Sequence, residues 1–441
     1  MDSYNQAIEL QPDYAEAYIN RGNALRDLGQ LEAAVESYDK AIQLRSDYVE
    51  TYSNRGVALA ELGQLEAAVD SYNQAIELQP DYAEAYYNRG NTLRDLGQLA
   101  KAVESYNRAI EFQPDFAEAH WNLSLALLLL GDLRNGWQEY EYRKLVKKGK
   151  RRVVLAPYPL WEGEPLVDKV ILVTAEQGVG DEVMFASCIP DLINLHPKQI
   201  ILECDLRLAP LFARSFQQVD VQGKDRKNVD WLKELGDIDF QIAIGSLPVF
   251  FRQQLSDFPA SRSFLVSNTV LRDKWRRRYD DLGPRMKIGI SWTGGVKDSR
   301  KRAKAPTLEQ WLPLLRMDAC FINLQYGDHR QELEQLKESS GVHIHHWADA
   351  DPLTDLDNQA AQIAELDLVI SFNNATVQIA GAIGKKTWVL VSIPPRWMYM
   401  LDRSNSPWYP ATKLFRQTES GGWVGVIEDV RDNLLREIHK Y

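Results

Sequence analysis

Apolar and polar residues in the first third of the chain recur with a period of 34 residues. Each period predicts two antiparallel helices, residues 15–28 and 31–44 in the first complete unit, with Gly29 in the turn between them. Aromatic, small and turn-forming residues recur in a fixed order. They are Tyr4, Tyr38, Tyr72, Tyr106 and Tyr140; Ala7, Ala41, Ala75 and Ala109; and Gly29, Gly63, Gly97 and Gly131.

This period and its residues resemble the tetratricopeptide repeat, in which helical pairs stack into a solenoid because no unit buries its apolar face alone. The small residues Gly22, Gly56 and Gly90 are expected to let paired helices approach closely. We expect an array over residues 1–150, made of a partial unit (1–14), three complete units (15–48, 49–82 and 83–116) and a divergent unit (117–150).

Asparagine occupies the same first-helix position in all four of the longer units. A primary amide both donates and accepts hydrogen bonds, so a ladder of amides can hold an extended peptide backbone without reading its sequence. The pattern resembles the asparagine-lined superhelix of O-GlcNAc transferase. The alternative is that asparagine is simply a common consensus residue here. The four candidate peptide-binding residues are Asn20, Asn54, Asn88 and Asn122.

From residue 157 onward, short apolar runs alternate with helical patterns, which predicts parallel α/β structure. The alternation starts afresh at Met286. We therefore predict two doubly wound halves that face each other across a cleft. Strands are expected at 169–175, 199–204 and 239–244 in the first half, and at 287–292, 320–325, 342–346, 368–370 and 386–392 in the second.

The clearest strand–turn–helix–strand pattern lies in residues 367–392. An apolar run at 368–370 is followed by small and polar residues and then by a short helix that Gly384 is expected to end. Such a unit places the amides of a helix N-terminus at the carboxyl end of a sheet, where anionic ligands bind. The alternative is an ordinary βαβ unit without a ligand.

Charge and composition narrow the classes of function. Residues 1–142 hold 24 Asp and Glu against 10 Lys and Arg, and an acidic array argues against nucleic acid as its partner. The longest apolar run, 125–130, is far shorter than the roughly 20 residues of a membrane span. Three cysteines without paired spacing and the lack of a signal peptide favour a cytoplasmic protein. Because the sequence starts within a repeat, further N-terminal repeats remain an open expectation.

Six sequence blocks stand in order between roughly residues 157 and 430. They are LWEGEPL, VTAEQGVGDEVMFASCIPDL, GISWTGG, INLQ, ELDLVISFNNATVQIAGAIGKKTWVLV and LDRSNSPWYPATKLFRQ. These blocks resemble the C-terminal domain of bacterial tetratricopeptide-fused glycosyltransferases, which is similar to the lipopolysaccharide heptosyltransferases of GT-B fold. The resemblance implies an α + α/β fold class: a helical solenoid, then a Rossmann-like acceptor domain (157–284) and a Rossmann-like nucleotide-sugar domain (285–441).

In the first half, the resemblance implies a catalytic role for Asp181 as the base that takes the proton of the acceptor hydroxyl. The alternative is that Asp181 is only a helix-capping or first-turn acid. Gly178 and Gly180 form an acceptor loop in which the backbone is accessible to a substrate. An amphipathic helix is expected from this loop to about Leu195.

In the second half, the resemblance implies donor binding. Thr293 and Gly294 end a strand in a turn suited to close contact with a diphosphate. A basic residue of the family offsets the charge of the leaving group, and it aligns with Lys304, or with Arg302 or Arg300 in its place. The alternative is that these residues form only an exposed basic loop. Gln325 matches a glutamine expected to contact the base or ribose.

The sequence departs from the family where an Asp and, five residues later, a His are usual. Asn373 and Gln378 stand there, which keeps hydrogen-bonding capacity and removes titratable chemistry. If that pair only positions phosphates, Asn373, Asn374, Thr376 and Gln378 still serve through amide donors and the helix N-terminus. If either family residue is chemically essential, the domain is an inactive relative.

No metal or cofactor is expected, since GT-B enzymes generally use no catalytic metal and the nucleotide-sugar is a substrate. His343 and His345 share a strand face but lack a third ligand of suitable spacing. The leading hypothesis is a glycosyltransferase whose array recruits a protein or peptide acceptor. The same chemistry on a glycan or lipid-linked acceptor, and a non-catalytic adaptor with a degenerate transferase domain, are the alternatives.

Overall fold

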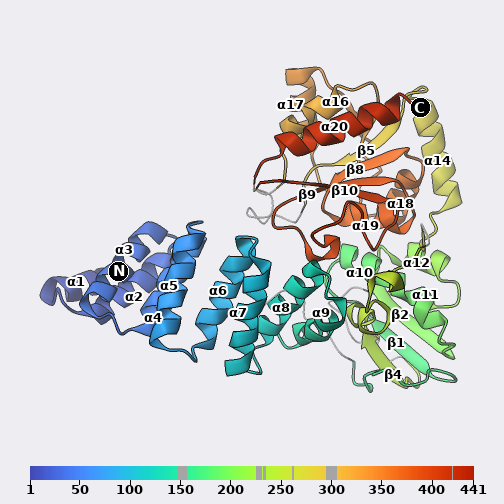
Figure 1. Ribbon diagram of the computed structural model, residues 1–441. Helices are drawn as coiled ribbons and strands as arrows, with labels where there is room; N and C mark the ends of the chain where they lie inside the picture. Colours follow the sequence, from blue (N-terminus) through green and yellow to red (C-terminus); the bar gives the residue numbers. More distant parts are fainter. Residues whose placement is uncertain (147–155, 225–230, 232–234, 261–262, 295–304, 420) are drawn as a thin grey trace. The chain divides into compact units, whose positions relative to one another are not determined.

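The computed structural model describes residues 1–146, 156–224, 231, 235–260, 263–294, 305–419 and 421–441. The chain divides into two compact units, Met1–Val146 and Lys147–Tyr441. Figure 1 shows the first as helices alone and the second as two sheets with flanking helices.

The first unit is a helical solenoid, as predicted. Successive helices pair in antiparallel fashion, and each pair packs on the next. Gly29 has a φ of +75° in the first turn, a left-handed conformation that glycine adopts without strain. The helices are α1 (Asp2–Leu10), α2 (Ala15–Asp27), α3 (Leu31–Leu44), α4 (Val49–Glu61), α5 (Leu65–Leu78), α6 (Ala83–Asp95), α7 (Leu99–Phe112), α8 (Ala117–Leu130) and α9 (Leu133–Tyr140), followed by the 3-10 turn η1 (Glu141–Lys144).

A glycine in the first helix of each complete repeat faces a tyrosine ring of the second helix. A Cβ on Gly56 would lie 2.5 Å from the Cε1 of Tyr72, and Tyr72 is only 2% exposed. The same contact recurs at Gly22 and Gly90. The predicted role of these glycines in close helix approach is therefore confirmed.

An arginine in the first helix ties successive repeats together. The Nη1 of Arg55 donates to the Oγ of Ser71 in its own repeat (2.9 Å), and its Nε donates to the Oδ1 of Asp39 in the preceding repeat (2.5 Å). Arg89 repeats the arrangement with Ser105 and Asn73. These bonds fix the register between neighbouring second helices.

The first half of the second unit holds a four-stranded parallel sheet of order β3-β2-β1-β4. Its predicted strands are confirmed, and β3 is an additional strand. The expected single helix to Leu195 is wrong. A short 3-10 segment interrupts it just before Pro190, whose ring has no N–H to donate to the preceding turn. The elements are β1 (Val170–Thr174), β2 (Gln199–Asp205), β3 (Asp220–Lys224), β4 (Phe240–Ala243), α10 (Val179–Phe185), η2 (Ala186–Cys188), α11 (Ile189–Ile193), α12 (Ala209–Ser215), η4 (Ile244–Ser246), α13 (Pro248–Phe251) and η5 (Leu255–Asp257).

The second half holds a six-stranded parallel sheet of order β10-β9-β8-β5-β6-β7. The five predicted strands are present, β7 is shorter than expected, and β10 is additional. The strands are β5 (Lys287–Ser291), β6 (Cys320–Asn323), β7 (Ile344–His345), β8 (Leu368–Phe372), β9 (Thr387–Val391) and β10 (Thr412–Arg416).

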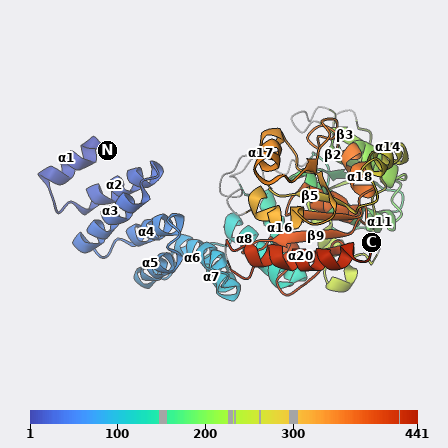
Figure 2. The same cartoon turned by 90° about the horizontal axis from the view of Figure 1, so that it is seen from above.

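Helices cover both faces of this sheet, so the two sheets are consistent with two Rossmann-like domains and a GT-B-like fold (Figures 1 and 2). One face carries η6 (Leu308–Trp311), α16 (Leu312–Leu315), α17 (Arg330–Ser340) and α20 (Val424–Ile438), and the other carries α14 (Thr269–Asp280), α18 (Leu356–Ala364) and α19 (Ala375–Ala382). The short turn η7 (Trp397–Tyr399) follows β9.

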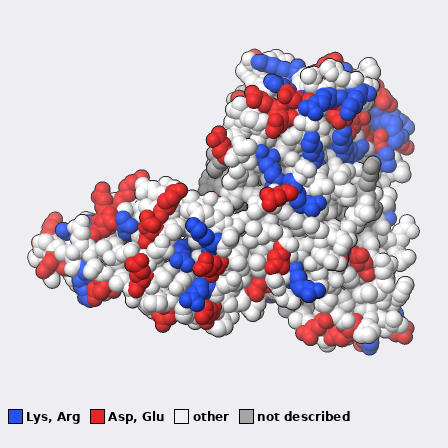
Figure 3. Space-filling view, in the orientation of Figure 1, with Lys and Arg blue, Asp and Glu red and all other residues white. Residues whose placement is uncertain are grey.

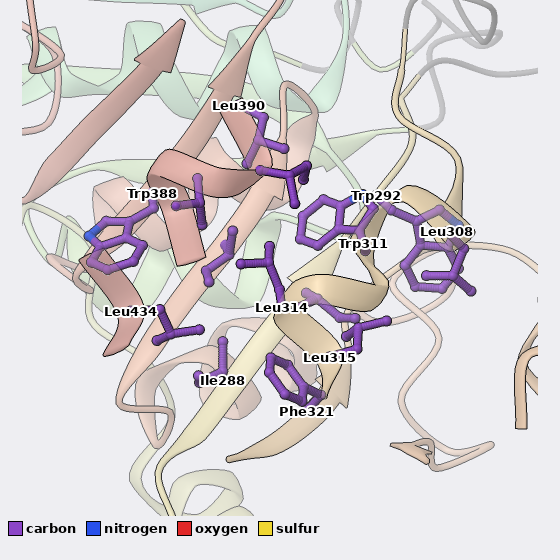
Figure 4. Packing of buried hydrophobic residues seen from close by; sticks show 14 of the residues in the cluster. Ile288, Trp292, Leu308, Trp311, Leu314, Leu315, Phe321, Trp388, Leu390 and Leu434 are labelled. Atoms are coloured by element: carbon purple, nitrogen blue, oxygen red, sulfur yellow. The ribbon is translucent and has the colours of Figure 1, made fainter. Parts of the chain in front are cut away.

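Tryptophan rings pack among leucine and isoleucine side chains in the core between the six-stranded sheet and α16, α20 and η6 (Figure 4). Trp311 is fully buried, and Trp292 and Trp388 are 2% and 3% exposed. A fully buried large side chain contributes about 1.5–3 kcal/mol. This core therefore holds β5 and the turn that follows it in a fixed position.

The Gly56–Tyr72 contact yields a stability prediction. Gly56→Ala is expected to lower the free energy of unfolding by about 1–3 kcal/mol, because the ring must shift to admit a methyl group. Chemical denaturation followed by circular dichroism measures this. The double variant Gly56→Ala with Tyr72→Leu should lose less than the two single losses combined. If the losses in free energy of unfolding simply add, the Tyr72 ring is not what excludes the methyl group.

Candidate functional site

The strand order of the second sheet reverses between β5 and β8, since β6 and β7 lie on one side of β5 and β8 to β10 on the other. In open α/β sheets, ligands bind in the crevice at such a point, outside the carboxyl ends of the strands. Thr293 follows β5, Asn373 and Asn374 follow β8, and Gln325 follows the neighbouring β6. Predicted donor-binding residues from three separate segments therefore gather at this edge.

Hydrogen bonds between buried side chains hold these loops together. The Oε1 of Gln325 accepts from the Oγ of Ser291 (2.9 Å) and the backbone N–H of Thr293 (3.0 Å). The Nδ2 of Asn374 donates to the Oγ of Ser291 (2.6 Å) and the carbonyl of Thr293 (3.0 Å). Asn374 also caps α19, because its Oδ1 accepts from the N–H of Thr376 (3.0 Å).

Two polar atoms of this group have no hydrogen-bond partner among the described residues. They are the Oγ1 of Thr293 and the Nε2 of Gln325. Buried polar atoms are nearly always paired, so an unpaired one calls for an explanation such as a ligand or a solvent molecule. Both atoms are buried and lie on two neighbouring loops of the switch point.

Exposure separates the predicted donor residues into two groups. Thr293 and Asn373 are partly exposed, whereas Gly294, Gln325, Asn374, Thr376 and Gln378 are buried. Thr376 is 1% exposed, and its Oγ1 accepts from the Nε2 of Gln359 (3.3 Å). Thr293 and Asn373 are therefore the accessible members of the group, and Gln325 and Asn374 hold the backbone of Thr293 in place.

Asn373 and Gln378, the two departures from the family pattern, are both engaged by tyrosines. The hydroxyl of Tyr399 donates to the Oδ1 of Asn373 (2.9 Å), and that of Tyr409 donates to the Oε1 of Gln378 (2.8 Å). Burial raises the pKa of both tyrosines well above its usual value. The hydroxyls therefore remain protonated and act as donors.

In the first half, Asp181 lies in the first turn of α10, which follows β1 at the switch point of that sheet. Its Oδ2 accepts from the N–H of Gly178 (3.2 Å), so the first-turn acid interpretation describes one of its contacts. Asp181 is 9% exposed. Its role as a base stays a prediction.

Gly180 is a point of close approach between the two halves. A Cβ on Gly180 would lie 3.3 Å from the Cγ of Gln378 and 3.5 Å from the Cα of Ala375. Because Gly180 has no side chain, α19 packs directly against it, and the position that a side chain would fill is not open space. Access of a substrate to the backbone of Gly178 and Gly180 remains a prediction.

Sequence reasoning missed one short segment that touches the predicted residues of both halves. Arg396 lies 3.9 Å from the Oδ1 of Asp181, and the indole of Trp397 stacks on Phe185 of α10 with ring centroids 6.3 Å apart. The next two residues contact α19 and its preceding loop: Met398 accepts from the Nε2 of Gln378, and Tyr399 bonds to Asn373. Only a tertiary structure reveals these partners.

Three glutamates support the carboxyl edge of the first sheet through backbone amides. The Oε1 of Glu176 accepts from Gly245 (2.7 Å), the Oε2 of Glu182 accepts from Asp205 (2.8 Å), and the Oε2 of Glu203 accepts from Ala175 (3.0 Å). Burial raises the pKa of Glu203 above its usual value. These acids position the loop that carries Gly178.

Some predicted residues cannot be placed. Arg300, Arg302 and Lys304 lie outside the described residues. Within the described part of the chain, no group of three or more His, Cys, Asp or Glu side chains is arranged to hold a metal ion. In the same part, no helix is long and apolar enough to cross a membrane.

In the repeat array, the four ladder asparagines differ in their surroundings. Asn20 is exposed and Asn54 and Asn88 are half-exposed, and their side chains make no hydrogen bond within the described array. Asn122, in contrast, donates through Nδ2 to the hydroxyl of Tyr87 (3.1 Å) and the Oδ1 of Asn91 (2.8 Å). Three ladder amides are therefore available to a partner, and the fourth is engaged.

Comparison with known proteins identifies the first unit. Residues 22–63, 58–93 and 90–131 match a family model described as TPR repeat, and residues 3–36 match one described as tetratricopeptide repeat. The first unit is therefore an array of tetratricopeptide repeats.

A curated relative covers more of the chain. Protein FlbA of Caulobacter vibrioides is 33% identical over 299 residues, which is 65% of this chain and 50% of FlbA. The chain thus spans about half the length of this relative. Among solved structures, a crystal structure of MamA is 28% identical and covers 32% of this chain and 81% of its own, with a TM-score of 0.31. YrrB, a TPR protein with an unusual peptide-binding site, is 27% identical over 32% of this chain and 72% of its own, with a TM-score of 0.29.

Asn374 provides a first test of the site's framework. Asn374→Ala is expected to lower the free energy of unfolding by about 2–4 kcal/mol, because it removes a helix cap and leaves the carbonyl of Thr293 and the Ser291 hydroxyl short of a donor. Denaturant unfolding of the full chain measures this. Asn433→Ala, which removes exposed side-chain bonds on α20, serves as the control. Equal losses in the two variants would contradict the proposed framework.

Glu203 provides a prediction on pH. Because its pKa is raised in the folded protein, the wild type loses stability relative to Glu203→Gln as the pH rises through that raised value. The variant is expected to be the more stable at neutral pH and equal to the wild type below the usual glutamate pKa of about 4.3. Thermal unfolding across pH measures the difference. A stability difference between variant and wild type that stays constant across pH would refute this prediction. So would an equal pH dependence in Glu428→Gln, which alters an exposed residue of α20.

Proposed function

We propose that the chain is a metal-independent glycosyltransferase that moves a sugar from a nucleotide-sugar donor to a protein or peptide acceptor recruited by the repeat array. The observation that carries this proposal is the meeting of Thr293, Gln325, Asn373 and Asn374 at the switch point of the six-stranded sheet. In this fold type, that position is where nucleotides bind. The unpaired Thr293 hydroxyl and Gln325 amide favour a polar ligand there.

On this proposal, the phosphates of the donor lie at the N-terminus of α19, where helix amides and the helix dipole favour negative charge. Asn373 and Thr293 are the partly exposed groups next to that end. Asp181 belongs to the opposite half, and its helix α10 packs against α19 through Gly180. A carboxylate placed across from the donor is suited to take a proton from the acceptor hydroxyl.

The repeat array would present the acceptor. Asn20, Asn54 and Asn88 offer amides that a peptide backbone can pair with, and Figure 3 shows acidic side chains along the array. An acidic surface favours a basic or neutral polypeptide over an acidic one. Recognition through backbone bonds would make the array tolerant of different acceptor sequences.

A second candidate is a non-catalytic adaptor. It is favoured by Asn373 and Gln378, which cannot titrate and are already bonded to Tyr399 and Tyr409. In that case, the second unit keeps the fold of a transferase and the array alone carries the function. Binding of nucleotides separates the two candidates.

Donor binding and chemistry are tested with one variant. Calorimetry with UDP, GDP and ADP is expected to show that at least one nucleotide binds the wild type. Asp181→Asn, which keeps an oxygen for the Gly178 amide, should retain that binding and lose sugar transfer by about 10²-fold or more. No binding of any nucleotide would favour the adaptor. Full transfer by the variant would remove Asp181 as the base.

Acceptor recruitment is tested on an array of unstructured basic and neutral peptides. Changing Asn54 and Asn88 together to Ala should weaken binding about thirtyfold, since two hydrogen bonds of roughly 1 kcal/mol each are lost. Asn122→Ala is the matched control, because its amide is already engaged by Asn91 and Tyr87. A loss as large in the control as in the double variant would count against the ladder.

A further inference from the structure

Arg396 differs from its neighbours in the segment between β9 and β10. The side chain of Arg396 is 49% exposed, whereas Met398 and Tyr399 are 3% and 1% exposed and are bonded to Gln378 and Asn373. The backbone of Tyr399 is held in addition by Arg416, whose Nη2 donates to the Tyr399 carbonyl (2.7 Å). The base of the Arg396 side chain is therefore fixed, while its guanidinium end can reorient.

The guanidinium of Arg396 lies beside Asp181, and the residues that follow Arg396 contact α19 and its preceding loop. Its Nη2 is 3.9 Å from the Oδ1 of Asp181, an ion-pair distance longer than that of a close hydrogen bond. Gly180, the residue before Asp181, contacts Ala375, the first residue of α19. A phosphate at the N-terminus of α19 would therefore lie near both the Asp181 carboxylate and the Arg396 guanidinium.

Two neighbouring anions in a partly buried site repel each other unless a cation offsets their charge. A guanidinium binds phosphate in a bidentate way and more strongly than it binds a carboxylate at a loose distance. Since Asp181 also accepts from the Gly178 amide, its carboxylate keeps a partner when Arg396 leaves. Arg396 thus has one anionic partner in the structure, Asp181, and a bound phosphate at α19 would be a second.

We propose that Arg396 exchanges partners, pairing with Asp181 before the donor binds and with the donor's diphosphate afterwards. The exchange makes Asp181 available to the acceptor hydroxyl only once the donor is in place, which orders the two substrates. This inference rests on the proposed function, because it requires a nucleotide diphosphate at α19. It adds a residue that the family pattern did not indicate.

Calorimetry on the full chain with each nucleoside diphosphate and its nucleoside tests the exchange. Arg396→Gln should weaken the diphosphate about tenfold and leave the nucleoside unchanged, because only phosphate contacts are lost. Arg396→Lys should recover part of the loss. Arg431→Gln, which removes an exposed pair with Asp432 on α20, should change neither.

Asp181→Asn should change diphosphate affinity in the opposite direction from Arg396→Gln. It removes the carboxylate that pairs with Arg396, so the diphosphate should bind severalfold more tightly. In the Arg396→Gln background, the same change should bring no gain. A gain that persists there would mean that Asp181 acts by simple repulsion, and it would overturn the exchange. Unchanged diphosphate affinity in Arg396→Gln would overturn it while leaving the proposed function intact. No diphosphate binding by the wild type would overturn both.

Discussion

Close packing of α10 against α19 is the contact on which the candidate site depends. Each of these helices follows a strand at the switch point of its own sheet. Gly180 lets them approach so closely that a methyl group there would lie within 3.3 Å of Gln378. On the proposed function, this approach is what brings the acid of one half and the helix amides of the other to the same substrate.

A buried polar network then fixes what the contact brings together. Ser291, Gln325 and Asn374 bond to one another and to the backbone of Thr293 inside the six-stranded half. In a medium of low polarity, such bonds are strong, and a missing partner is costly. The described residues that directly follow β5, β6 and β8 are therefore held to one another, and Asn374 caps the start of α19.

The sequence predicted the parts of the structure that depend on local pattern. A period of 34 residues specified the paired helices of the array, and apolar runs specified the strands from β1 to β9 with the exception of β3. The polar strand β3, Asp220–Lys224, lacks an apolar run because it lies at the sheet edge, and β10 follows a segment without a clear helical pattern.

Contacts between distant segments were beyond the reach of the sequence. Arg396 and Tyr399 carry no motif, and their roles follow from the position of η7 over α10 and α19. The bond between Asn91 and Asn122 likewise joins two repeats, and Asn88 lacks an equivalent because Val57 stands at the position that corresponds to Asn91. The resemblance to GT-B enzymes named residues of the site, but only the fold shows which of them are exposed to a ligand and which are framework.

Hydrogen–deuterium exchange of the full chain with and without UDP, GDP or ADP shows whether a nucleotide binds at the switch point. One nucleotide is expected to protect residues 292–294, the start of α19 and the segment 396–399, and to leave the repeat array unaffected. Protection confined to other regions, or none with any of the three, would contradict a nucleotide site at the switch point of the six-stranded sheet.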